Sequence, residues 1–134
     1  MKFTLTAASL TFASALLASA QVPTTINYDD RYCRAAERNG IENRWPTFGQ
    51  VPQFPQIGGG FPVAGFNDTD CGSCWLVSYA GTGRGVPITL INSAPSGFTL
   101  CTDTLLALTG FDRDNVPDNI PVTVVQVAAS ECGQ

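Results

Sequence analysis

The chain has 134 residues, 44% of them hydrophobic and only 13% charged, and it contains no histidine. The missing histidine excludes Ser-His-Asp and Cys-His catalytic groups and removes the commonest metal ligand, so we predict neither a cofactor nor a metal. With 7 basic against 11 acidic residues, nucleic acid and anionic membrane are unsuited as partners, because nothing offsets repulsion by phosphate. The composition favours polysaccharide, another protein or an apolar interface.

The N-terminus has the pattern of a secretory leader. Lys2 supplies a positive charge, Leu5–Leu17 is mostly apolar and small, and Ala18-Ser19-Ala20 has the A-x-A form of a cleavage site. The apolar run is too short for a transmembrane helix, and no later stretch approaches the length that a bilayer requires. We therefore predict a secretory signal peptide over residues 1–20 and one exported domain over residues 21–134.

The first third of the mature chain predicts little regular structure. Residues 21–30 are expected to be extended, and Arg31–Arg38 to form a short helix with Asp29 or Asp30 as its N-cap and Asn39-Gly40 as its end. Residues 46–62 are rich in proline and glycine, which rules out a helix and disfavours regular strand pairing. Apolar residues are interleaved there, which indicates a packed loop.

The remaining chain alternates strand and turn signals. A helix with inward-facing leucines is expected over Thr102–Leu108, followed by Gly110 as its C-terminal glycine. Short strands, Gly/Pro turns and small helices predict a mainly β fold, a compact closed barrel with short peripheral helices. The predicted strands are Val63–Phe66, Trp75–Ala80, Val86–Ile91 and Ile120–Ala128, with a hairpin turn at 81–85 between the second and the third.

Five cysteines in the mature chain leave at least one without an intramolecular partner. A local Cys71–Cys74 bond is disfavoured, because the redox version of this motif places its tryptophan before the first cysteine in a βαβ setting. If the two side chains diverge instead, Cys33–Cys71 and Cys74–Cys132 become the expected disulfides.

Cys101 is then the cysteine left over. It stands at the start of the predicted helix, where the helix dipole favours a thiolate. Two interpretations stay open, a small buried residue in a monomer or an exposed thiol that links a dimer. Asn67-Asp68-Thr69 is an N-glycosylation sequon, and the alternative is that Asn67 only shapes a turn.

Several short motifs together resemble the fungal cerato-platanin family. Order and spacing agree over nearly the whole mature chain, and the joint pattern is specific. The matching pieces are Tyr28-Asp29-Asp30-Arg31-Tyr32, Trp45-Pro46-Thr47-Phe48-Gly49, Val51-Pro52-Gln53-Phe54-Pro55, Ile57-Gly58-Gly59, Ala64-Gly65-Phe66, Cys71-Gly72-Ser73-Cys74-Trp75 and Val125-Gln126-Val127 before Cys132.

The resemblance implies a six-stranded double-psi β-barrel like that of expansins, with two disulfides in the pattern given above. It also implies a non-enzymatic protein secreted into the medium or the fungal cell wall. Such a protein binds chitin or N-acetylglucosamine oligomers, self-assembles at surfaces, loosens cellulose without hydrolysis, and elicits plant defence through a possible surface receptor.

Three departures from the family pattern bear on the site. A segment that relatives carry between Tyr32 and Cys33 is absent, so a rim loop of the binding groove is expected to be trimmed. Cys101 has no counterpart in the usual set of four cysteines. Asn92 stands where relatives commonly carry an aspartate that corresponds to the acid of hydrolytic barrels, and an amide cannot act as a proton donor there.

The carbohydrate hypothesis places Tyr28, Asp29, Asp30 and Asn92 on a polar floor, with Tyr32, Trp45 and Phe61 as possible rims. The structural alternative makes Tyr28 and Trp75 core residues and Asp29 or Asp30 a helix cap. A second hypothesis is a surface-active protein with an outward apolar patch. The third, a glycoside hydrolase, needs two carboxylates across a cleft, and Asn92 removes one of them.

Overall fold

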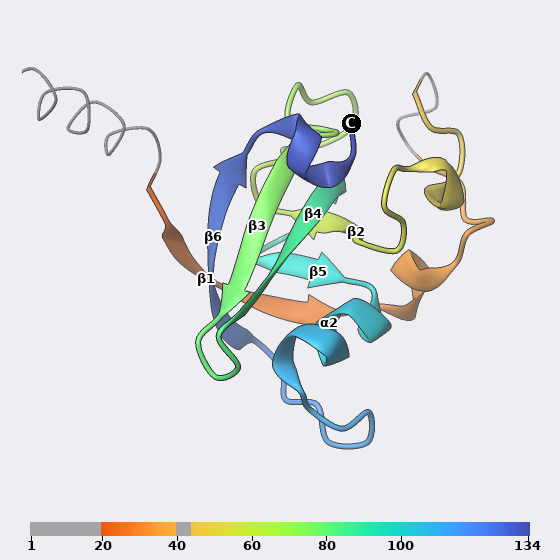
Figure 1. Ribbon diagram of the computed structural model, residues 1–134. Helices are drawn as coiled ribbons and strands as arrows, with labels where there is room; N and C mark the ends of the chain where they lie inside the picture. Colours follow the sequence, from red (N-terminus) through yellow and green to blue (C-terminus); the bar gives the residue numbers. More distant parts are fainter. Residues whose placement is uncertain (1–19, 40–43) are drawn as a thin grey trace, which may run out of the picture.

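Six strands close into a barrel in the computed structural model, which describes residues 20–39 and 44–134 (Figure 1). The order around the barrel is β1-β5-β2-β4-β3-β6, in which β1–β5 and β2–β4 are parallel and all other neighbours antiparallel. The predicted barrel is therefore confirmed. The strands are β1 (Val22–Tyr28), β2 (Ile57–Gly60), β3 (Cys74–Tyr79), β4 (Arg84–Ser93), β5 (Phe98–Leu100) and β6 (Ile120–Val127).

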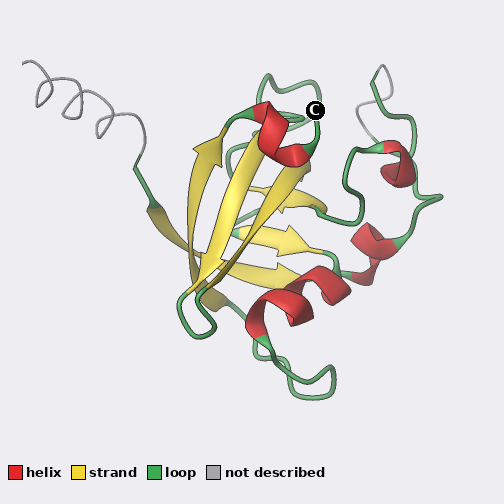
Figure 2. Cartoon of the chain, viewed as in Figure 1, coloured by secondary structure: helices red, strands yellow, loops and turns green. Residues whose placement is uncertain are grey.

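Alternation of side chains explains why β6 lines the barrel. Ile120, Val122 and Val124 are buried, while Pro121 and Thr123 between them are more exposed, as expected when successive side chains point to opposite faces. The inward residues of the other strands complete one apolar core, and α2 (Thr102–Thr109) packs beside β1 and β4 (Figure 2). Gly110 ends α2 in the left-handed conformation at φ 76°, as predicted.

A second apolar cluster lies outside the barrel. Tyr32, Phe48 and Val51 pack on Ile57 of β2 and Ile91 of β4, and the Tyr32 and Phe48 rings stack at 5.6 Å between centroids. The segment between β1 and β2 is thereby held on the barrel, which confirms the predicted packed loop.

The predicted secondary structure needs three corrections. The helix expected over Arg31–Arg38 is a 3₁₀-helix, Asp30–Cys33, and Arg34 after it is extended. Residues 46–62 contain the 3₁₀-helix Phe48–Gln50 and the fully paired strand β2. Val63–Phe66 forms turns and no strand. A third 3₁₀-helix, Ala129–Cys132, follows β6.

Close approach of the backbone explains β2. A Cβ atom added to Gly58 would lie 2.2 Å from the carbonyl oxygen of Thr99 on β5. Gly58 and its two glycine neighbours are all buried. A glycine run that normally indicates a loop is here a central strand, because only glycine fits between β5 and β4.

The disulfides are Cys33–Cys101 and Cys74–Cys132, so the predicted Cys33–Cys71 bond is wrong and Cys71 is the free thiol. The parallel pairing of β1 and β5 sets Tyr28 opposite Leu100, and the N–H of Asp29 donates to the Leu100 carbonyl at 2.9 Å. The residues that follow each strand therefore meet. The dimer linked through Cys101 is excluded, because that sulfur is fully buried in a bond.

The predicted leader, residues 1–20, lies outside the described part of the chain except for Ala20. Among the described residues, no helix is long and apolar enough to cross a membrane.

Candidate functional site

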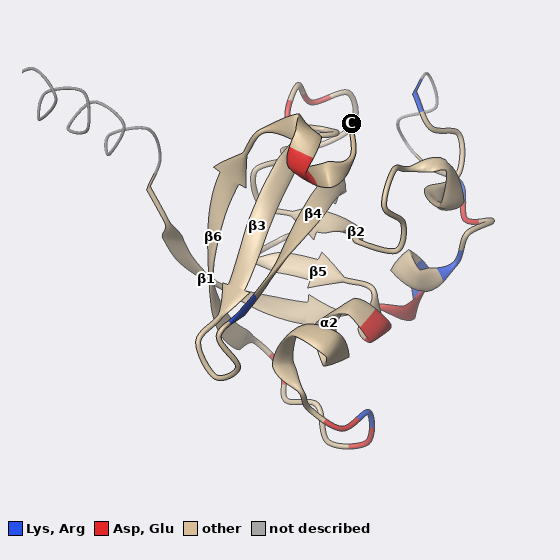
Figure 3. Cartoon of the chain, viewed as in Figure 1, with Lys and Arg blue, Asp and Glu red and all other residues tan. Residues whose placement is uncertain are grey.

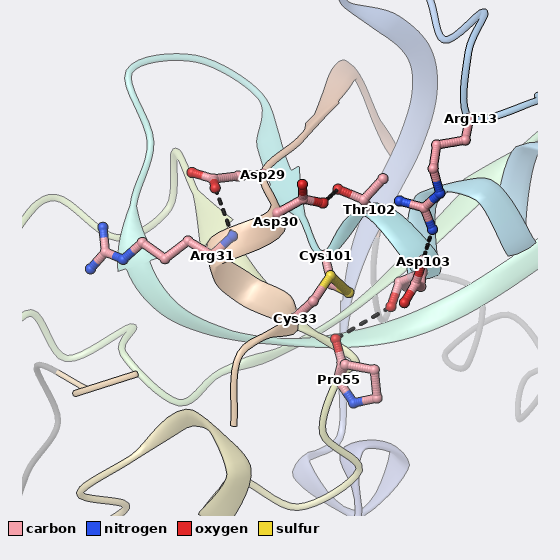
Figure 4. Close-up of a disulfide and its surroundings, with 10 residues drawn as sticks. Asp29, Asp30, Arg31, Cys33, Pro55, Cys101, Thr102, Asp103 and Arg113 are labelled. Carbon is pink, nitrogen blue, oxygen red and sulfur yellow. Dashed lines mark hydrogen bonds and ion pairs between the residues drawn. A yellow bond between two sulfur atoms is a disulfide. The ribbon is translucent and has the colours of Figure 1, made fainter. Parts of the chain in front are cut away.

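Three of the four predicted sugar-binding residues form an exposed acidic ledge at the end of β1, defined as Tyr28, Asp29 and Asp30. Asp29 caps the 3₁₀-helix, its Oδ1 accepting from the Arg31 N–H at 2.8 Å, and Asp30 accepts a hydrogen bond from the Thr102 hydroxyl (Figure 4). Both carboxylates thus have structural partners yet remain open to solvent. Tyr28 is 44% exposed, so its interpretation as a core residue is wrong.

Asn92 of β4 belongs to a different part of the surface. Its Oδ1 accepts from the Ser93 N–H at 2.9 Å, and its side chain is hydrogen-bonded to the Tyr32 phenol. Since Oδ1 faces Ser93, we infer that the amide group of Asn92 donates to the Tyr32 oxygen. Burial raises the pKa of Tyr32, and this hydrogen bond partly lowers it.

The acidic ledge and Asn92 lie on different strands of the barrel. Tyr28 and Asn92 are on β1 and β4, which are separated by β5 and β2 in one direction around the closed barrel and by β6 and β3 in the other, so the path along the wall is three interstrand spacings, about 14 Å. Tyr32 bridges part of this gap, because its hydroxyl lies over Gly59, 2.8 Å from where a Cβ would stand. A ligand touching both ends must be longer than a single sugar ring.

The predicted rim aromatics have mixed positions. Tyr32 is 4% exposed and belongs to the second apolar cluster, so it is not a rim. Trp45 is half-buried under the Arg44 guanidinium, 4.2 Å from the ring centroid. Phe61 is 40% exposed and packs edge-on against Phe98. Trp75 packs on the barrel core, as expected.

Sequence reasoning missed Phe66. It is 79% exposed and lines a small pocket of about 90 Å³, which we call the loop hollow. The sequence predicts a strand that ends at Phe66, and nothing in that prediction indicates an exposed turn. The family motif Ala64-Gly65-Phe66 is the one sequence signal that singles out this residue. The loop hollow is lined by Gly65, Phe66, Asn67, Cys71, Ile91 and Asn92.

Cys71 and the sequon share the loop hollow. Burial, with Asp68 and Asp70 nearby, raises the pKa of the half-buried Cys71 thiol, and its sulfur lies 4.0 Å from the Gly65 carbonyl. A neutral thiol is a weak nucleophile. Asn67 is exposed with φ 61°, so the residue is accessible and also shapes a turn.

Charges gather away from the barrel wall, in the segment after β1 and in the loop after α2 (Figure 3). Arg31 pairs with Glu37 at 3.3 Å, and Asp103 pairs with Arg113. Potential ligand atoms of Cys33, Cys101 and Asp103 lie within 4.8 Å of one another, but the two sulfurs are bonded together and offer no thiolate to a metal.

Comparison with known proteins places this geometry in a family. The Cerato-platanin family model matches residues 24–134. The chain is 34% identical over 128 residues to "Allergen Asp f 15" of Aspergillus fumigatus, covering 81% of this chain and 83% of the relative. It is also 34% identical over 94 residues to "Cerato-platanin" of Ceratocystis fimbriata f. sp. platani, covering 70% and 68%.

Solved structures agree with the sequence matches. The crystal structure of cerato-platanin 2 from M. perniciosa superposes with a TM-score of 0.77 at 30% identity, covering 84% of this chain and 100% of that one. The solution structure of "the fungal elicitor Cerato-Platanin" gives a TM-score of 0.67 at 31% identity, covering 83% and 96%.

Proposed function

The chain belongs to the cerato-platanin family, and on that premise we propose that it is a secreted, non-catalytic protein that binds chitin or N-acetylglucosamine oligomers and elicits plant defence. The observation that carries the binding proposal is the exposed ring of Phe66 beside Asn92 in the loop hollow. An exposed aromatic face next to an amide suits a sugar, which presents a flat apolar face and hydroxyl groups.

The acidic ledge supplies the second half of the proposed surface. The carboxylates of Asp29 and Asp30 are exposed acceptors for sugar hydroxyls, and Tyr28 adds a half-exposed ring. Because the ledge and Asn92 are about 14 Å apart along the barrel wall, the proposal favours oligomers over monomers. Affinity for an oligomer would then be the sum of several weak contacts, each partly exposed to solvent.

Cleavage of the bound polymer is not part of the proposal. Glycoside hydrolysis needs two carboxylates on opposite sides of the scissile bond. Asp29 and Asp30 are adjacent on one ledge, and across the sheet stands the Asn92 amide, whose oxygen already accepts from Ser93. Expansin-like loosening of the wall without hydrolysis remains compatible with this arrangement.

The test is a titration of ¹⁵N-labelled protein with a hexamer of N-acetylglucosamine, followed by amide shifts. Phe66→Ala is expected to weaken binding about tenfold, as loss of a central aromatic contact commonly does. Asp29→Asn removes the charge while keeping an N-cap, which separates binding from helix capping. Asp118→Asn, an exposed carboxylate elsewhere, is the matched control and should bind like the wild type.

Two results would sink the proposal. If the oligomer moves no amide of the acidic ledge or the loop hollow at millimolar concentration, sugar is not the ligand of this surface. If reducing sugar is released from chitin or β-glucan and Asp29→Asn or Asp30→Asn abolishes the release, the protein is an enzyme.

A surface-active role is the second candidate, favoured by the exposed apolar side chains. Phe66 is 79% exposed, and Val22, Tyr28 and Phe61 are each 40% exposed or more. Exposed rings of this kind can mark an interaction surface. Surface tension measured against protein concentration tests it, with Phe66→Ser expected to reduce the effect; equal curves for both proteins would reject Phe66 as the contact.

A further inference from the structure

A cavity lies beside the first half of β4, and none of its lining residues belongs to the acidic ledge or the loop hollow. Its volume is about 330 Å³, and it lies between β4, α2 and the Pro55-Gln56 turn, which is the lower end of the size range of ligand sites. Pro55, Val86, Ala107 and Leu108 make its apolar wall. We call it the strand-edge pocket.

One side of the strand-edge pocket is backbone without a neighbouring strand. β2 covers β4 only from Thr89 onward, so the earlier residues of β4 pair with β3 alone. The Leu90 N–H donates to Ser73 on the β3 side at 3.0 Å, and the Thr89 N–H donates to Gln56 on the opposite side at 3.1 Å. Alternate residues of an antiparallel strand direct their N–H and C=O to opposite edges.

This alternation fixes which groups face the pocket. Gly85 and Pro87 lie four and two residues before Thr89, so their backbone polar groups point, like those of Thr89, away from β3 and toward the uncovered edge. Gly85 is exposed and lines the pocket. It offers one N–H and one C=O there, and Pro87 offers only a C=O, so the edge has the groups to pair with a short extended backbone.

The rim of the pocket carries one arginine, Arg84, and one aspartate, Asp103. Arg84 is the only charged residue in the six strands, and its Nη1 donates to the Ala107 carbonyl at 2.7 Å. This hydrogen bond uses one of five guanidinium donors. Among the described residues Arg84 has no carboxylate partner, whereas Asp103 at the same rim is paired with Arg113. The rim therefore holds an uncompensated cation.

We propose that the strand-edge pocket binds the C-terminal end of an extended peptide whose last side chain is apolar. The peptide backbone exchanges hydrogen bonds with Gly85, the last side chain fills the space beside Val86 and Ala107, and the terminal carboxylate accepts from the Arg84 guanidinium. A groove between a strand edge and a helix is a known mode of peptide capture. The pocket shares no lining residue with the acidic ledge or the loop hollow, so it is an additional binding activity.

The experiment uses the mature protein labelled with ¹⁵N and an acetylated tetrapeptide, alanine-threonine-valine-leucine, with either a free carboxylate or a C-terminal amide. The free acid should shift the amides of Gly85, Val86 and Ala107 and bind at least about tenfold more tightly than the amide. Arg84→Ala should abolish this preference. Arg34→Ala, which removes an exposed arginine on another segment, should preserve it.

A second pair of variants tests the cavity without touching the charge. Ala107→Trp fills the pocket from an exposed position on α2 and should block binding, while Ala80→Trp on the exposed hairpin should not. Equal binding of acid and amide, or no effect of either Arg84→Ala or Ala107→Trp, would overturn the proposal. So would 4-phenylbutyrate moving Ala107 as strongly as the peptide while Gly85 stays still, because the pocket would then be a site for small acids.

Discussion

Removing the Cys33–Cys101 disulfide should be the most destabilising single change to the cysteine framework that we can specify. The bond joins the residues after β1 to the residue before α2, and its two cysteines are 68 positions apart in the sequence. The chain-entropy model gives about 4 kcal/mol for a closed loop of this length. The double variant Cys33→Ala with Cys101→Ala avoids placing a hydroxyl at position 101, which is fully buried.

The magnitude is large against the stability of a domain of this size. Net stabilities of small domains are about 5–15 kcal/mol, so a loss of about 4 kcal/mol removes from about a quarter to about four fifths of the total. For a domain of about 110 residues the same loss lowers Tm by about 15 °C. The Asp30–Thr102 hydrogen bond spans the same junction and is expected to weaken when the tether is lost.

Guanidinium unfolding followed by tryptophan fluorescence measures the effect, with the slope m reporting the expanded unfolded state. Cys71→Ala is the control, because that thiol is half-buried and unbonded, and we expect a change below about 1 kcal/mol. A large loss for the control would refute our account of the framework: if Cys71→Ala lost about 4 kcal/mol and Cys101→Ala alone almost none, the bond would join Cys33 to Cys71.

Three further predictions concern single residues. Gly58→Ala should destabilise the barrel by about 3 kcal/mol through overpacking, because its Cβ meets the Thr99 carbonyl; Gly65→Ala, with open space around the Cβ, should change unfolding free energy by less than about 0.5 kcal/mol, and similar losses for both would reject the packing argument. The raised pKa of Cys71 means that stability is fully present below the unfolded thiol's pKa of about 8.5 and falls as pH rises through the folded value, so Cys71→Ser should flatten urea-unfolding stability between pH 8 and 10. The raised pKa of Tyr32 should make its phenol ionise last in an absorbance titration, and Asn92→Ala should raise that pKa further; an unchanged or lower value would contradict the hydrogen bond between them.

Much of the barrel could be predicted from the sequence because its longer strands obey local rules. Short-range preferences determine three of its features: the alternation of β-branched residues in β6, the glycine-rich turn between β3 and β4, and Gly110 after α2. β2 could not be predicted, since its glycines are selected by contact with β5, a strand of three residues that follows 37 residues later. The register between β2 and β5 depends on tertiary structure, and local sequence patterns do not predict it.

The same distinction explains the site. Asp29 could be predicted as a cap and an exposed acid, because capping is local. The pairing of Cys33 with Cys101 depends on β1 and β5 running parallel, and the exposure of Phe66 depends on a turn that resembles a strand in its composition. The first depends on how distant segments meet, and the second on a turn whose composition gives no local signal, so the functional surface is harder to predict than the barrel that carries it.

The pairing of β1 with β6 has a consequence for biogenesis. Val22 lies opposite Val124, and Ile26 opposite Ile120, so the first strand to be synthesised has no neighbour on that side until almost all of the polypeptide has followed. Its other neighbour, β5, also arrives late. In a nascent molecule the first strand is therefore unpaired, the kind of segment that holding chaperones shield, and the barrel closes only after the C-terminal strand has been synthesised.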